Sequence, residues 1–121
     1  MKIFEEDGRV NFVDENNVFV GYNMGENCCE RFGWFISEET HVEIPEKEPK
    51  TPDVSDYVFD TSFFVLSPPK DEYEEGGIAC FKLGAKDKPI LFLHLYNSHN
   101  GYYSHGFTFK INDKVIKEDS L

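Results

Sequence analysis

Apolar and polar residues alternate along most of the chain, which is the pattern of half-buried β-strands. The segments 9–13 (RVNFV) and 18–22 (VFVGY) flank the turn-rich tetrapeptide DENN, and together they predict a β-hairpin. A short strand is expected at 34–36 and a longer one at 57–68. Between these two, the polar stretch 38–56 contains several prolines and predicts a long exposed loop.

The last third of the chain has the clearest strand pattern. After a second polar loop at 68–77, which ends in a Gly-Gly that opens the next strand, strands are expected at 78–83, 89–96, 102–111 and 114–117.

Two short connections in this region carry the residues of tight turns. Asn100-Gly101 lies between the strands expected at 89–96 and 102–111, and Asn112-Asp113 precedes the last strand. These residue types tolerate the left-handed backbone of two-residue hairpin turns. The stretch 94–107 (HLYNSHNGYYSHGF) is therefore expected to form the tip of a hairpin.

Alternation also predicts which side chains are buried. In 89–96 three leucines share one face, and the other face is apolar enough to be covered too, which predicts a central strand. His105 is in phase with Phe107 and Phe109, so it is expected to face the core. The predicted core consists of Phe12, Val20, Phe63, Val65, Phe81, Leu91, Leu93, Leu95, Phe107 and Phe109.

These elements predict a single, mainly β domain over residues 1–121. Its architecture is expected to be a single antiparallel sheet or a small two-layer β roll or sandwich, with one or two short helices at most. A chain of this size buries about two-thirds of its unfolded surface, so it needs neither disulfides nor a metal to fold.

The charge is distributed unevenly and limits the classes of partner. The net charge is −11; residues 1–60 carry 15 acids and 5 bases, whereas residues 61–121 carry 8 acids and 7 bases. An acidic half repels nucleic acid and anionic membranes, so direct nucleic-acid binding is not expected. Acidity serves solubility first, and it also favours a protein partner with a basic surface.

The same sequence predicts no membrane association. It has no apolar run of about 18 residues, which a membrane-spanning helix needs. The N-terminus (MKIFEEDGR) shows no apolar signal-peptide region, so a cytoplasmic location is expected.

Three histidines, His94, His99 and His105, lie within twelve positions and raise the question of a metal site. Zinc takes four ligands, mostly nitrogen or sulfur, and Cys28 and Cys29 could complete such a set. However, no recognised zinc spacing is present, so the histidines are weak candidates and no cofactor is expected. The alternative is that His105 is hydrogen-bonded and half-buried and that His99 is a turn residue.

The cysteines Cys28, Cys29 and Cys80 are expected to be reduced thiols in a cytosolic protein. If a helix began at Cys28, its N-terminus would lower the pKa of the thiol there and make it reactive, with Glu30 close by. No family-type cysteine signature is present, and most free cysteines behave as small buried hydrophobes. Whether the protein is an enzyme stays open, with a binding protein favoured.

Aromatic and short polar side chains around position 100 are typical of adaptable binding surfaces. The candidate binding residues here are Tyr96, His99, Asn100, Tyr102, Tyr103, Ser104 and His105. The alternative is that the tyrosines only pack on their cross-strand neighbours. A homodimer joined through the outward face, with Tyr102, Ser104 and Thr108, is a further alternative.

Two short elements, NCCE at 27–30 and NGYYS at 100–104, together carry a family resemblance. The chain resembles, roughly over 18–111, a small domain family of unknown function from bacteria and their phages. Members show a Cys-Cys-Glu element and an Asn-Gly-Tyr-Tyr-Ser element. Asn27 stands where an Asp is usual, and the histidine often found before that element is not present. The resemblance implies no established activity, only that Cys28, Cys29 and Glu30 lie near residues 100–104.

Taken together, the sequence favours a non-enzymatic module that binds another protein, in a phage-, host-interaction or defence-related setting. The alternative is a small metal- or thiol-dependent enzyme or ligand binder that uses Cys28, Cys29, Glu30, His99 and His105.

Overall fold

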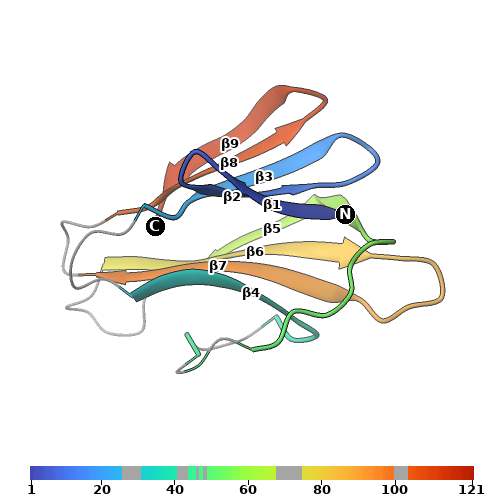
Figure 1. Ribbon diagram of the computed structural model, residues 1–121, viewed down its shortest axis with the longest axis horizontal. Helices are drawn as coiled ribbons and strands as arrows, with labels where there is room; N and C mark the ends of the chain where they lie inside the picture. The colour runs from blue at the N-terminus through green and yellow to red at the C-terminus, as the bar shows by residue number, and fades with distance from the viewer. Residues whose placement is uncertain (26–30, 41–43, 46, 48, 68–74, 100–103) are drawn as a thin grey trace.

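A computed structural model describes the chain in two antiparallel β-sheets packed face to face (Figure 1). The described residues are 1–25, 31–40, 44–45, 47, 49–67, 75–99 and 104–121. They contain nine strands and no helix. The mainly β prediction is confirmed, and of the two predicted architectures the two-layer arrangement is the one present.

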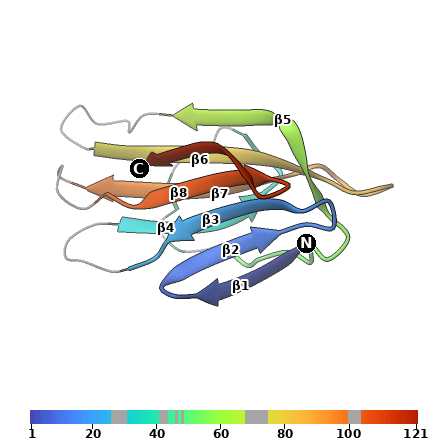
Figure 2. The same cartoon turned by 90° about the horizontal axis from the view of Figure 1, so that it is seen from above.

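The larger sheet has the strand order β1-β2-β3-β8-β9, and Figure 2 shows it lying over the smaller sheet. Its strands are β1 (Lys2–Glu6), β2 (Arg9–Val13), β3 (Val18–Asn23), β8 (Gly106–Ile111) and β9 (Lys114–Ser120). The predicted hairpin at 9–13 and 18–22 is confirmed as β2 and β3. Strand β1 was missed by sequence reasoning, because consecutive acids at its end interrupt the apolar pattern.

The smaller sheet has the strand order β4-β7-β6-β5. Its strands are β4 (Arg31–Ser37), β5 (Val58–Ser67), β6 (Glu75–Gly84) and β7 (Leu91–His99). The prediction that β7 is a central strand is confirmed, because it pairs with β4 on one side and β6 on the other.

The Gly-Gly pair lies at the start of strand β6, as predicted, but the strand begins at Glu75, so the predicted loop at 68–77 is wrong over its last residues. Gly76 and Gly77 pair with Ser98 and Asn97 of β7 and have φ angles of 108° and 142°. A side chain on Gly76 would meet the backbone oxygen of Asn97. Only glycine fits this close approach of two strands.

The predicted hairpin tip at 94–107 is also wrong. Strand β7 pairs within the smaller sheet, whereas β8 pairs with β3 and β9 in the larger one. The chain therefore crosses between the sheets after His99, although Asn100 and Gly101 themselves lie outside the described residues. Turn residues indicate that a strand ends, but they do not specify which sheet the next strand joins. By contrast, the turn at Asn112-Asp113 is confirmed, with φ angles of 50° and 67°.

The core fills the space between the two sheets. Most predicted core residues are buried there: Phe12, Val20, Phe81, Leu91, Leu93, Leu95, Phe107 and Phe109. Two predictions on β5 are wrong, because Phe63 is only partly buried and Val65 is 45% exposed. The pairing of β5 shifts register between Phe59 and Phe64, so that Phe64 packs on the core instead.

The predicted loop at 38–56 has no strand or helix among its described residues. The described residues contain no helix that is long and apolar enough to span a membrane.

Candidate functional site

Both crossings between the sheets leave from the same end of the molecule. Strand β3 is antiparallel to β8, and β4 is antiparallel to β7. The last residues of β3 and β7 and the first residues of β4 and β8 therefore lie at one end of the sandwich (Figure 1). The described residues that flank the two sequence elements are therefore neighbours. Cys28, Cys29, Glu30, Asn100, Tyr102 and Tyr103 themselves lie outside the described residues, so their proximity stays a prediction.

His105 joins the sheets at this end. Its side chain is 1% exposed, which confirms the predicted core-facing orientation. Its Nδ1–H donates to the backbone oxygen of Asn23 at 2.7 Å, and its ring stacks on Phe32 of β4 at 4.0 Å. Its backbone exchanges two hydrogen bonds with Leu121. His105 therefore has a structural role here, while its neighbour Ser104 is exposed.

The three histidines do not converge. His94 and His99 lie on opposite faces of β7, because side chains alternate along a strand, and His105 precedes β8 of the other sheet. Within the described residues, no group of three His, Cys, Asp or Glu side chains could hold a metal ion. Tyr96 and His99 are both buried, at 4% and 8% exposure.

His94 is enclosed on the outer face of the smaller sheet. Its ring stacks on Phe35 at 4.5 Å, and its Nε2 lies 3.0 Å from the backbone oxygen of Glu39 and 3.1 Å from Ser37 Oγ. Because a carbonyl oxygen only accepts, Nε2 carries the hydrogen. Burial lowers the pKa of His94 to about 4, so the ring is neutral at pH 7.

Cys80 lies directly opposite His94 on strand β6. Its thiol is buried, and burial raises its pKa to about 11. A neutral thiol beside a neutral imidazole is a poor nucleophile, because the reactive form of cysteine is the thiolate. This pair therefore packs as part of the protein interior.

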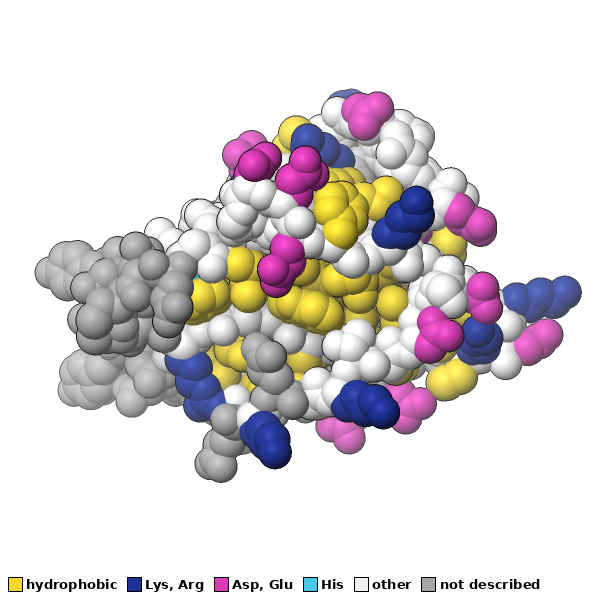
Figure 3. All heavy atoms as spheres, viewed as in Figure 1, with side chains coloured by type: hydrophobic (Ala, Val, Ile, Leu, Met, Phe, Trp, Pro, Cys, Tyr) yellow, Lys and Arg dark blue, Asp and Glu magenta, His cyan; other side chains and the backbone are white. Residues whose placement is uncertain are grey.

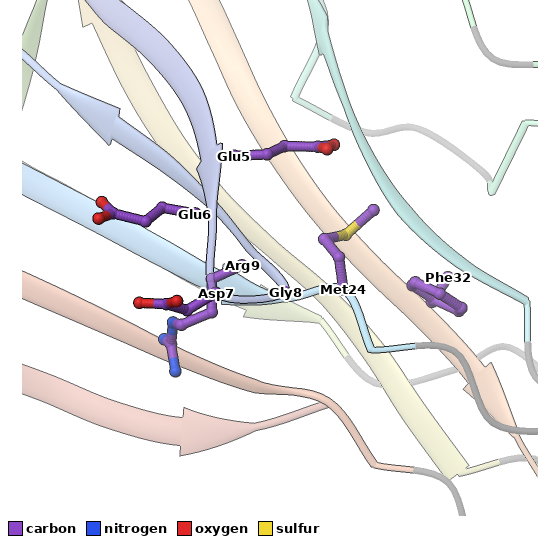
Figure 4. A pocket seen from close by; sticks show the side chains of 7 residues that line it. All are labelled: Glu5, Glu6, Asp7, Gly8, Arg9, Met24 and Phe32. Atoms are coloured by element: carbon purple, nitrogen blue, oxygen red, sulfur yellow. The ribbon is translucent and has the colours of Figure 1, made fainter.

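A depression lies between the β1–β2 turn and the start of β4 (Figure 4). We call it the acidic depression; it measures about 400 Å³ and is lined by Glu5, Glu6, Asp7, Gly8, Arg9, Met24 and Phe32. Figure 4 shows the Glu5 side chain extending to the side of β1 on which Met24 and Phe32 lie, whereas Glu6 extends to the other side. One carboxylate thus lies on the same side of β1 as an aromatic ring and a thioether.

An apolar strip runs between the two sheets on the same side of the molecule (Figure 3). Strands β1 and β4 are the sheet edges here, and their residues Ile3 and Trp34 are only partly buried against the core. Acidic side chains project above the strip in Figure 3.

A second depression, of about 330 Å³, lies on the outer face of the larger sheet, among Phe4, Asn11, Phe19 and Lys110. Sequence reasoning missed both depressions, because it placed the candidate site near position 100. The acids at 5–7 were a visible signal, but β1 had to be recognised before their position could be understood.

Comparison with known proteins adds no relative: no family model, curated protein or solved structure matches the chain.

Proposed function

We propose that this protein is a non-enzymatic module that binds a basic segment of another protein at the acidic depression. The observation that carries the proposal is that the Glu5 side chain lies on the same side of β1 as Met24 and Phe32, with which it lines the depression. A lysine or arginine side chain has an apolar stem and a charged head. Its stem can pack on Phe32 and Met24 while its head meets the carboxylate of Glu5, and the remaining acids at the turn add to the attraction.

The charge of the whole chain supports the same partner. Residues 1–60 contribute a net charge of −10 to the total of −11, and the acidic depression is built mainly from this half. A field of this sign accelerates the approach of a basic partner and slows that of an acidic one. The contribution of exposed charges decreases with ionic strength, so binding should weaken as salt is added.

The alternative, a thiol- or metal-dependent enzyme, draws no support from the described residues. Its proposed thiols, Cys28 and Cys29, lie outside them, and the one cysteine among them has a raised pKa. A cytoplasmic location and a phage- or defence-related setting belong to the same proposal as the binding function. A homodimer through the outward face also remains a prediction.

The test uses two double variants that remove the same charges at two places. Glu5→Gln with Asp7→Asn neutralises the acidic depression, and Glu118→Gln with Asp113→Asn is the control on the β8–β9 hairpin. Each pair combines an exposed strand glutamate with a turn aspartate that has a positive φ angle, 53° for Asp7 and 67° for Asp113. Asparagine tolerates this conformation, so both variants should fold.

The probe is a short fluorescein-labelled peptide of alternating arginine and leucine residues, and binding is followed by fluorescence anisotropy. We expect the first variant to weaken binding about tenfold more than the control, which corresponds to roughly 1.4 kcal/mol. Affinity of the wild-type protein should fall steeply between about 50 and about 500 mM NaCl. Equal weakening in both variants, or binding that is insensitive to salt, would contradict the proposal.

A further inference from the structure

The second depression lies on the opposite side of β1, on the outer face of the larger sheet. Phe4, Asn11, Gly21 and Thr108 are cross-strand neighbours there and form one row over β1, β2, β3 and β8. We call this depression the sheet groove. Its volume of about 330 Å³ is within the range of small-ligand pockets, roughly 300–1,000 Å³.

The groove exists because one position in this row has no side chain. A Cβ atom on Gly21 would lie 2.9 Å from the ring of Phe19 and 3.2 Å from Asn11 Oδ1. The Phe19 ring therefore lies over the glycine and forms an apolar wall beside Asn11. Any larger residue at position 21 would displace the ring or the amide.

Asn11 is the polar group at the base of the sheet groove. Asn11 as a residue is only 6% exposed and its amide forms no hydrogen bond to the described part of the chain, but its polar atoms are not enclosed and therefore open into the groove. An amide that opens into a groove is hydrated in the free protein, and a ligand that offers equivalent hydrogen bonds can replace that water. An amide held in this state on the wall of a groove can both donate to and accept from a ligand.

The charges around the groove cancel. Glu6 and Asp7 contribute two negative charges, and Arg9 and Lys110 contribute two positive ones. Among the described residues neither cation forms an ion pair: Arg9 lies 3.4 Å from Thr108 Oγ1, and Lys110 Nζ lies 5.3 Å from the centre of the Phe19 ring. Within a chain of net charge −11 this balance is local, and it favours a ligand without net charge.

We infer that the sheet groove binds a neutral saccharide. The groove offers one unpartnered amide, the hydroxyl of Thr108, remaining guanidinium N–H groups of Arg9, and the ring of Phe4, which is 40% exposed. A pyranose matches this set, because its hydroxyls both donate and accept while its C–H face packs on an aromatic ring. Hydroxyls that meet no protein group remain hydrated in so open a site.

An extended peptide fits the groove less well. Its backbone carries a donor and an acceptor at nearly every residue, and these need partners when they leave water. A sheet edge supplies such partners, but the face of a sheet does not, because its backbone groups are already paired. The inference goes beyond the proposed function, because it concerns another face of the protein and another class of ligand, although the two depressions share Glu6, Asp7 and Arg9 at the β1–β2 turn.

The test is a titration followed by ¹⁵N–¹H NMR, in which the Asn11 side-chain amide is directly visible. The probes are cellobiose, maltose and N,N′-diacetylchitobiose, with an uncharged tetrapeptide as the competing class. We expect saturable shifts of the Asn11 amide and of the backbone amides of Gly21 and Thr108 with at least one disaccharide. The variants Asn11→Ala and Phe4→Ala should weaken this binding about tenfold or more.

Asn16→Ala is the matched control, since Asn16 is an exposed asparagine in the turn after β2. Phe4→Ala keeps the experiment decisive if Asn11→Ala fails to fold, because Phe4 is exposed on an edge strand. Absence of shifts with all three sugars, or equal binding by the variants and the control, would overturn the inference. Shifts produced only by the tetrapeptide would assign the groove to peptides and reject the saccharide.

Discussion

At the scale of single residues, His94 couples the stability of the fold to pH. Its pKa is about 4 in the folded protein, because burial disfavours the charged ring, against 6.5 for an ordinary histidine. Between these two values the unfolded chain binds more protons than the folded one. Stability contributed by this residue is therefore fully present above pH 6.5 and is lost as the pH falls toward 4.

We expect the free energy of unfolding to fall by about 2 kcal/mol between pH 7 and pH 5 on account of this residue. The variant His94→Gln keeps a hydrogen-bonding side chain but does not titrate, so it should be less stable at pH 7 and should vary less over this range. Urea denaturation at several pH values measures both. Parallel pH profiles for the two proteins would show that His94 does not carry the effect.

The burial of Asn11 is a second residue-scale feature, and it depends on the neighbouring strand. Asparagine in a strand is ordinarily exposed or hydrogen-bonded, and nothing local marks this one as different. It becomes a largely buried residue at the base of a groove only because Gly21 and Phe19 lie next to it across the strand pair.

At the scale of secondary-structure elements, strand β5 shows how one irregularity reverses an alternating pattern. Its sequence alternates well enough to predict a strand, but the register shift between Phe59 and Phe64 exchanges inward and outward positions. Val65 is therefore 45% exposed, whereas Val20 of β3 is fully buried. A bulge inserts an unpaired residue, and its position depends on the partner strand rather than on β5 alone.

This difference predicts unequal effects of the same substitution. Val20→Ala removes two buried methyl groups and should lower the free energy of unfolding by about 2 kcal/mol. Val65→Ala serves as its matched control and should change stability by less than about 0.5 kcal/mol. Urea midpoints of the two variants provide the comparison, and a loss at position 65 as large as that at position 20 would contradict the register of β5.

At the scale of the whole molecule, Asp14 connects the two sheets. It follows β2 and is 6% exposed; its Oδ1 accepts hydrogen bonds from the backbone N–H groups of Asn16 and Val18. Its Oδ2 accepts from the N–H of Phe59, on β5 of the other sheet, at 2.8 Å. One carboxylate thus closes a turn and joins the layers.

We expect Asp14→Asn to lower the free energy of unfolding by about 2 kcal/mol, because the amide nitrogen cannot accept and one buried donor loses its partner. Asp53→Asn is the control, since Asp53 accepts from Ser55 N–H within an exposed turn and joins no other element. Its effect should stay below about 0.5 kcal/mol. Thermal or urea unfolding of both variants measures the difference, and equal small effects would show that Asp14 does not hold the layers together.

The residues of the acidic depression also fall into those that the sequence reveals and those that only the fold brings there. The acids at 5–7 are evident in the sequence, and the acidity of the N-terminal half follows from composition alone. Met24 and Phe32 turn those acids into a depression with an apolar side; Met24 directly follows β3 of the same sheet, and Phe32 lies on β4 across the sandwich. Their position depends on where the chain crosses between sheets, which no local pattern specifies.

Local chemistry therefore determined the strands, the turn at Asn112-Asp113 and the inward face of His105, because alternation and turn propensity act between residues close in the chain. The pairing of strands was decided only by the tertiary structure. Turn residues after β7 fit a hairpin and a crossing equally well, and the choice depends on which distant surfaces are buried together. Both depressions arise from that choice, since each is lined by residues from strands that meet only in the folded protein.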